Sequence, residues 1–144
     1  MHFDSSAQVR ANLPAGRELP TKFDAFVRAA TAKCVRIEWN DPDPFGFKRT
    51  ARKQLLPFLK IGDGGLIALW YHADVPAVLH IGSEGQREVI AATFDDYLKE
   101  INAKFADDKE YIYADERYRI PGVKGKPNRS KLAELQTKFD AWFE

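Results

Sequence analysis

The fold is decided by the stretch LLPFLKIGDGGLIALWYHADVPAVLHIGSEGQREVIAATFDDYLKEINAKF, residues 55–105. It holds four apolar runs separated by short connections, two of them rich in glycine, and this pattern is typical of a meander of antiparallel strands. The connection between the second and third runs, Ala73–Asp74, is expected to be a two-residue turn. The predicted strands cover residues 55–61, 66–72, 75–81 and 86–91, and the glycine-rich turns are Gly62–Gly65 and Gly82–Gly85.

A helix is predicted directly after the meander. Thr93 is placed to cap its N-terminus, and the carboxylates of Asp95 and Asp96 suit the positive end of the helix dipole. Apolar side chains then recur at helical spacing and form one stripe, made of Phe94, Tyr97, Leu98, Ile101 and Phe105. The polar residues between them are expected to face water: Lys99, Glu100 and Lys104.

Further elements are predicted on both sides of this region. A helix over residues 22–33 and another over residues 130–143 each carry an apolar face, and Val35–Trp39 alternates as a half-buried strand does. Residues 1–18 are expected to form an irregular lead-in, so that residues 19–144 make up a single domain. The fold class predicted is α+β, with an antiparallel sheet of about five strands and helices packed mainly on one face.

Composition and charge restrict the function. A chain of 144 residues suits one domain, and a formal net charge of +1 lacks the basic excess of a dedicated nucleic-acid binder. Cys34 is the only cysteine, which excludes an intramolecular disulfide and a Cys-rich zinc site. Residues 1–16 lack the apolar core of a secretory signal, and no run reaches the ~18 apolar residues of a membrane span. We therefore expect a cytoplasmic protein that does not contact a membrane.

Two histidines in the meander, His72 and His80, raise the question of a metal site. With a two-residue turn between the second and third strands, His72 pairs with Val75 and His80 pairs with Ile67. Side chains alternate along a strand, so the two imidazoles then lie on opposite faces of the sheet. They cannot share an ion in that arrangement, and we expect no metal site.

Other residues that could carry chemistry lack the required arrangement. Asp95 and Asp96 are neighbours on a helix and point in different directions, so capping explains them better than acid–base catalysis. Gly62–Gly65 leads into a strand and not into the helix N-terminus that a phosphate-binding loop needs. No catalytic spacing of serine, histidine and acid is recognisable. We expect no catalytic residue, no cofactor and no enzymatic activity, since an enzyme would need a site that the sequence does not reveal.

A basic loop precedes the meander. Its four cations, with Phe45 and Phe47 beside them, are Lys48, Arg49, Arg52 and Lys53. Basic loops with aromatic residues bind single-stranded nucleic acid, so this function is one alternative. A solvated loop suits the nearly neutral chain better, and an acidic protein partner is a third interpretation.

Several motifs of the central stretch recur in one known family. They are Leu56-Pro57-Phe58, the turn Gly62–Gly65, the apolar Ala68–Trp70, the segment Pro76–Gly85 and the helix start Thr93–Leu98. This combination resembles the SUKH superfamily, small α+β domains related to a fungal cell-wall regulator and abundant in bacteria. Leu19–Phe23 fits the start of the family's N-terminal Leu-Pro-x-x-[FY] helix, although the Asn-Gly turn that usually follows is missing.

The resemblance implies function by binding. Many bacterial members resemble immunity proteins, which neutralise a cognate secreted toxin, such as a nuclease, by stoichiometric binding and need no catalytic groups. The two glycine-rich turns are predicted to lie at the same end of the meander, where Asp63, Ser83 and Glu84 form the recognition surface expected for a basic toxin. Ordinary polar turns are the alternative for that end, and a regulatory scaffold that binds a host protein is the alternative for the function.

Overall fold

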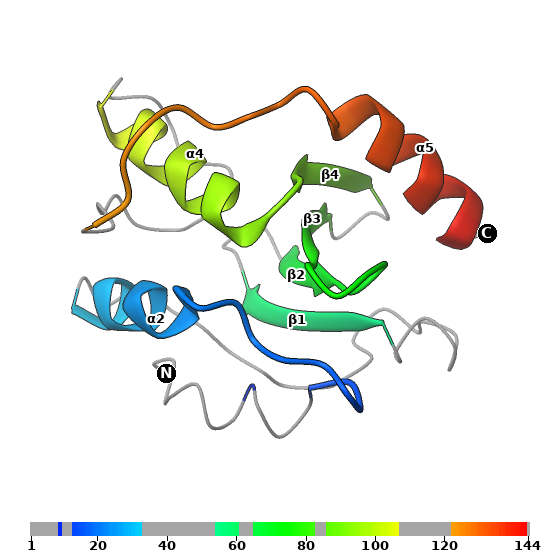
Figure 1. Cartoon of the computed structure of the whole chain (residues 1–144), viewed down its shortest axis with the longest axis horizontal. Helices are drawn as coiled ribbons and strands as arrows, with labels where there is room; N and C mark the ends of the chain where they lie inside the picture. Colours follow the sequence, from blue (N-terminus) through cyan, green and yellow to red (C-terminus); the bar gives the residue numbers. More distant parts are fainter. Residues whose placement is uncertain are drawn as a thin grey trace.

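The computed structural model describes Val9 and residues 13–32, 54–60, 65–82, 86–106 and 122–143. The sheet within this part of the chain has four antiparallel strands in the order β1-β2-β3-β4 (Figure 1). The strands are β1 (Leu55–Lys60), β2 (Leu66–Trp70), β3 (Ala77–Ile81) and β4 (Arg87–Ala91). The predicted meander is therefore confirmed, with four strands and not about five. The additional strand expected at Val35–Trp39 lies outside the described residues.

The connection between β2 and β3 is longer than predicted. Trp70 pairs with Ala77, so the whole of Tyr71–Pro76 lies between the two strands. Pro76 has no N–H to donate to a sheet ladder, and the N–H of Tyr71 donates to the carbonyl of Gln54 at 2.8 Å. The expected pairing of His72 with Val75 is therefore wrong, because both residues lie in the connection.

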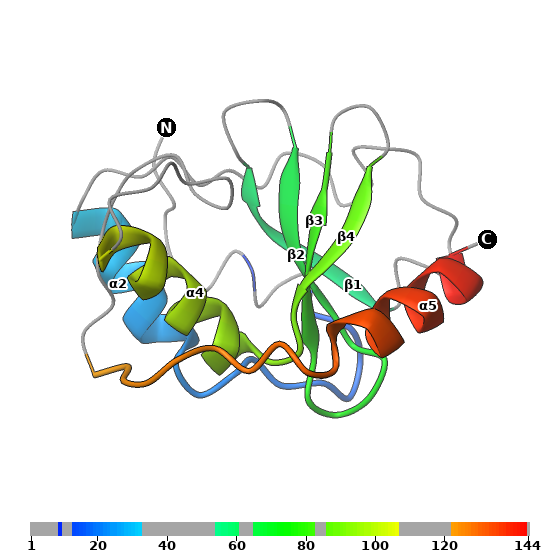
Figure 2. The same ribbon diagram turned by 90° about the horizontal axis from the view of Figure 1, so that it is seen from above.

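Three helices are described, and they cover both faces of the sheet (Figure 2). They are α2 (Phe23–Ala32), α4 (Phe94–Ala106) and α5 (Leu132–Phe143), each close to a predicted range. The views show α2 and α4 together on one face and α5 on the opposite face. Two of these helices thus share a face, as expected. None of the three combines the length and the apolar character that crossing a bilayer requires.

The core between the sheet and the α2–α4 pair is largely aromatic. The ring of Phe58 on β1 lies edge-on to Phe23 and Phe26 of α2, with centroids 5.5 and 5.6 Å apart. Phe94 and Tyr97 of α4 lie against the same ring, and such contacts add to the stabilisation from burial alone. This core extends into the predicted lead-in, because Val9 is fully buried in it and Leu13 packs against it.

The opposite face of the sheet is covered by α5. Phe139 is buried against Trp70 of β2, with ring centroids 5.0 Å apart, and Trp142 contacts the same indole at 5.6 Å. The apolar side chains of the sheet that complete this second core are Leu55, Ala77, Leu79, Ile81 and Val89. Successive side chains of β3 thus point alternately into the two cores, because side chains alternate between the faces of a strand.

Residues 122–130, which we call the strap, run along α4 towards α5 (Figure 1). Two carboxylates of α4 hold the strap. Asp96 Oδ1 accepts the N–H of Asn128 at 3.1 Å, and Glu100 accepts two hydrogen bonds from Arg129, at 2.8 and 2.7 Å. Glu100 is only 6% exposed, so the expectation that it faces water is wrong. Its partner comes from a segment 29 residues away, which helical spacing cannot reveal.

Candidate functional site

The residues predicted to contact a partner lie outside the described residues. This holds for Asp63, Ser83 and Glu84 in the turns and for Lys48, Arg49, Arg52 and Lys53 in the basic loop. The strand ends that adjoin the turns are described. Leu66 pairs with both Lys60 and Ile81, and Ile81 pairs with Arg87. The strand ends that adjoin the two turns therefore lie at the same end of the sheet, as predicted.

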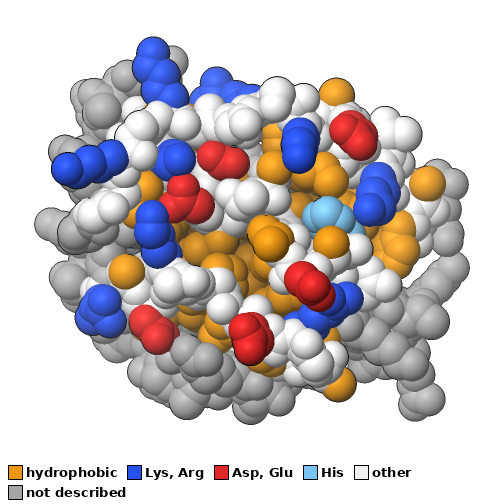
Figure 3. Space-filling model, in the orientation of Figure 1, with side chains coloured by type: hydrophobic (Ala, Val, Ile, Leu, Met, Phe, Trp, Pro, Cys, Tyr) orange, Lys and Arg blue, Asp and Glu red, His pale blue; other side chains and the backbone are white. Residues whose placement is uncertain are grey.

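A groove of about 440 Å³ opens near the opposite end of the sheet. Three segments that are distant in sequence line it: Glu18–Lys22 before α2, Asp74–Pro76 in the β2–β3 connection, and Thr93–Asp95 at the start of α4. Figure 3 shows hydrophobic side chains gathered in the middle of this face, with charged side chains around them. The groove is thus a hollow between the two helix starts and the longest described connection of the sheet.

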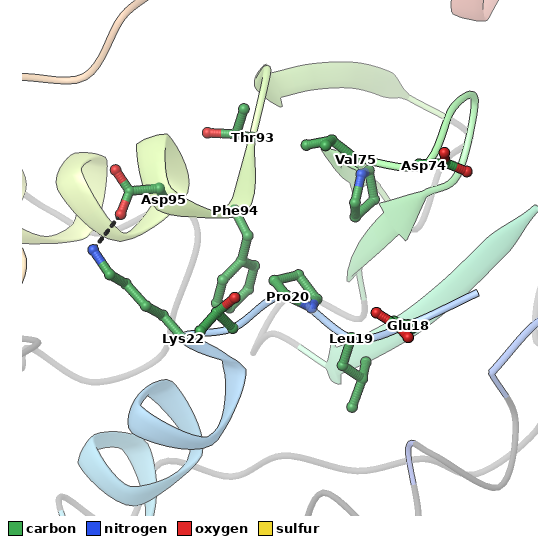
Figure 4. A pocket seen from close by; sticks show the side chains of 11 residues that line it. Glu18, Leu19, Pro20, Lys22, Asp74, Val75, Thr93, Phe94 and Asp95 are labelled. Carbon is green, nitrogen blue, oxygen red and sulfur yellow. Dashed lines mark hydrogen bonds and ion pairs between the residues drawn. The ribbon is translucent and has the colours of Figure 1, made fainter.

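The centre of the groove is apolar. Figure 4 shows Pro20 and Phe94 between its two ends and Val75 above them. Val75 is 59% exposed, and the other large hydrophobic side chains that the structure describes are buried or half-buried. A single exposed hydrophobic residue is ordinary on a protein surface. This one borders an apolar hollow, which is the arrangement that binding sites share.

Charged side chains mark the two ends of the groove (Figure 4). At the α4 end, Lys22 Nζ donates to Asp95 Oδ1 at 2.6 Å, and Lys99 Nζ lies 3.0 Å from Oδ2. The hydrogen bond from Lys22 is the main reason why the pKa of Asp95 lies below its ordinary value. At the other end, Arg17 Nη1 donates to Asp74 Oδ1 at 2.9 Å.

Tyr71 fixes the segment that forms this second end. Its hydroxyl donates to the carbonyl of Glu18 at 2.8 Å, and the guanidinium of Arg17 lies 5.9 Å from the centre of its ring. Burial raises the pKa of Tyr71 to about 12, against an opposing effect of the Arg17 charge. The phenol therefore stays protonated and keeps its hydrogen bond at any physiological pH.

The start of α4 is held by the predicted cap. Thr93 Oγ1 accepts the N–H of Asp96 at 3.1 Å and donates to Asp96 Oδ2 at 3.2 Å. Asp95 is instead paired with lysines on the groove side. The two neighbouring carboxylates thus engage separate partners and do not converge, as predicted. Their arrangement positions the helix and offers no acid–base pair.

The two histidines lie on opposite faces of the sheet, although by a different route from the one expected. His80 pairs with Ile67, as predicted, and its side chain lies on the face opposite to Leu79. The His72 ring lies 4.8 Å from that of Trp70, on the α5 face. No group of three metal-ligating side chains occurs among the residues that the structure describes.

Several groove residues were noted in the sequence as capping or motif residues, such as Thr93, but none was predicted to line a binding site. Arg17 and Asp74 are 57 residues apart, so no local spacing brings them together. One sequence feature could have indicated the groove. Val75 is an apolar residue directly before Pro76, and a proline favours the end of a strand, so the Val75 side chain need not be buried in the sheet.

No protein-family model, no curated protein and no solved structure matches the chain. The resemblance to the SUKH superfamily therefore rests on the quoted motifs alone.

Proposed function

We propose that the protein is a non-catalytic binding domain, and that it neutralises a cognate secreted toxin in the cytoplasm by forming a stoichiometric complex. The observation that carries this proposal is the groove, in which exposed Val75 borders an apolar hollow with charged side chains at both ends. Protein interfaces combine an apolar centre with a polar rim in the same way. The nature of the partner comes from the resemblance to immunity proteins.

Three contacts hold the walls of the groove in one conformation, which favours binding. The Tyr71 hydroxyl holds the Glu18 carbonyl, the Lys22–Asp95 pair joins α2 to α4, and the Thr93 cap fixes the start of α4. A surface that is already held in one conformation loses less conformational entropy on binding, so a larger share of the contact energy becomes affinity. Neutralisation then needs only that the bound protein covers the toxin's active site.

The other end of the sheet stays a second predicted contact region, through Asp63, Ser83 and Glu84. The strand ends that adjoin its turns lie at the end of the sheet opposite to the groove. A partner that contacts one end need not reach the other, so substitutions at the two ends separate the two surfaces. Loss of binding on changing Val75, with no loss on changing Glu84, assigns the interface to the groove.

The proposal is tested by co-expression with the toxic product of a neighbouring gene. We expect restored growth and a 1:1 complex in size-exclusion chromatography with light scattering. The proposal fails if no neighbouring product is toxic, or if growth is restored without a complex. Recovery of a harmless endogenous partner would favour the regulatory scaffold. Salt-sensitive retention of single-stranded oligonucleotides, weakened by Arg49→Ala and Arg52→Ala, would favour nucleic-acid binding.

A further inference from the structure

The two ends of the groove differ in how their charges are balanced. At the α4 end, two cations share one carboxylate, because Lys22 and Lys99 both pair with Asp95. At the other end, Glu18 and Asp74 bring two carboxylates, and Arg17 is the cation paired with Asp74. We call Glu18 and Asp74 the acidic end, since negative charge exceeds positive charge there.

The carboxylates of the acidic end can accept a further cation. The Asp74 side chain is fully exposed, and the ion pair with Arg17 uses only its Oδ1 atom. Glu18 is also exposed, and within the described ranges no lysine or arginine lies at ion-pair distance from its carboxylate. The guanidinium of Arg17 lies 5.9 Å from the centre of the Tyr71 ring and pairs with Asp74, so one positive charge faces the two carboxylates of this end.

The apolar centre lies directly beside the acidic end. In Figure 4, Val75 is next to Asp74 in the connection, and Pro20 and Phe94 lie between that end and the Lys22–Asp95 pair. Pro20 and Pro76 supply no backbone N–H at two positions of the groove wall.

From this juxtaposition we infer that the groove binds a partner segment in which an apolar side chain lies next to a lysine or arginine. The inference deepens the proposed function and rests on it, because it states the chemistry of the toxin segment that docks there. The apolar side chain fills the hollow beside Val75, and the cation lies against Glu18 and Asp74. The exposed carboxylates select the charge of the segment, and the apolar contact supplies most of the affinity.

The test uses the full-length protein, isotope-labelled for NMR, and three short peptides with blocked ends. Their sequences are Gly-Leu-Arg-Gly, Gly-Leu-Glu-Gly and Gly-Gly-Arg-Gly. We expect the first to give saturable shifts of the Val75 methyl groups and of the amides of Thr93–Asp95. The second peptide lacks the cation and the third lacks the apolar side chain. Each is expected to bind about fivefold more weakly than the first or not at all, because it loses one exposed ion pair or one small apolar contact.

Protein variants separate the two contributions. Glu18→Gln is expected to reduce the preference for arginine over glutamate in the peptide, and Val75→Asn is expected to reduce the preference for leucine over glycine. Glu134→Gln removes an exposed carboxylate on α5, on the other side of the sheet, and serves as the control that leaves both preferences unchanged. Equal binding of the three peptides, binding of none of them, or shifts confined to other surfaces would overturn the inference.

The outcomes also separate this inference from the proposed function. If the toxin binds 1:1 but none of the peptides binds and Glu18→Gln and Val75→Asn leave the complex unchanged, the inference is wrong and the proposed function stands. If the arginine peptide binds as described but no toxin is neutralised, the groove has the inferred chemistry and the proposed function is wrong.

Discussion

Gln136 on α5 pairs its side-chain amide with the backbone of Val89 on β4. Its Oε1 accepts the Val89 N–H at 2.7 Å, while its Nε2 donates to the carbonyl of Arg87 at 3.2 Å and to Asp140 Oδ1 at 3.0 Å. The groups of Arg87 and Val89 that it engages point to the same edge of the strand, where a further strand would pair. One side chain thus occupies the edge that otherwise invites association with another chain.

Replacing Gln136 tests this pairing. Gln136→Ala removes the partner of the Val89 N–H in a part-buried hydrogen bond, and the loss of such a bond costs about 0.5–1.5 kcal/mol. We expect the free energy of unfolding, measured by urea denaturation, to fall by that amount. The neighbouring Thr137→Ala, on the exposed side of α5, is the control and is expected to change stability by less than about 0.5 kcal/mol. Equal effects of the two substitutions would contradict the pairing.

The strap offers a second test. Arg129→Ala leaves the buried carboxylate of Glu100 without its two hydrogen bonds, and we expect a loss of about 1–3 kcal/mol in unfolding free energy. Amide hydrogen exchange over residues 122–130 is expected to become faster, because the same contact holds the strap on α4. Lys131→Ala removes an exposed cation two residues away and is the matched control. Unchanged exchange in Arg129→Ala would show that the Glu100–Arg129 contact is not what holds the strap.

A third prediction concerns the titration of His72. Burial against Trp70 lowers the pKa of its imidazole below 6.5, and the charge of Lys138 lowers this pKa further. The unfolded chain therefore binds a proton at His72 at a higher pH than the folded protein does. The stability that depends on neutral His72 is complete above pH 6.5 and is lost as the pH falls towards the lower pKa of the folded state.

The pKa of His72 is measurable directly by NMR titration. We expect a value below 6.5 in the wild type and a higher value in Lys138→Gln, because the Lys138 Nζ lies 3.4 Å from His72 Nδ1. Lys131→Gln, which removes a cation near the start of the same helix, is expected to leave the pKa of His72 unchanged. A pKa above 6.5 in the wild type, or the same pKa in Lys138→Gln, would rule out this description of the site.

Local patterns in the sequence were sufficient for most of the fold. The meander and α4 were predicted because glycine-rich turns, apolar runs and the Thr93 cap act over only a few residues. The error in the β2–β3 connection has a local cause as well. Pro76 has no N–H to donate to the ladder, and the β2–β3 pairing ends at Trp70 and Ala77.

The candidate site was not predictable in the same way. Its contacts join segments that are distant in the chain, such as Lys22 to Asp95, which are 73 residues apart. Glu100 was assigned to the surface because it is a polar residue outside the apolar stripe, and the contact with Arg129 of the strap explains its burial. The residues that sequence reasoning favoured for binding, such as Asp63 and Arg49, lie outside the described part of the chain.

If the groove beside Val75 binds the partner, a substitution there weakens the complex. The measurement is the dissociation constant of the full-length protein with the toxic neighbouring gene product, obtained by calorimetry. We expect a 1:1 complex that Val75→Asn weakens at least about tenfold, as the loss of a central apolar contact does, while the exposed control Thr137→Asn leaves the affinity unchanged. The absence of a complex, or equal affinities for wild type and Val75→Asn, would contradict binding in the groove.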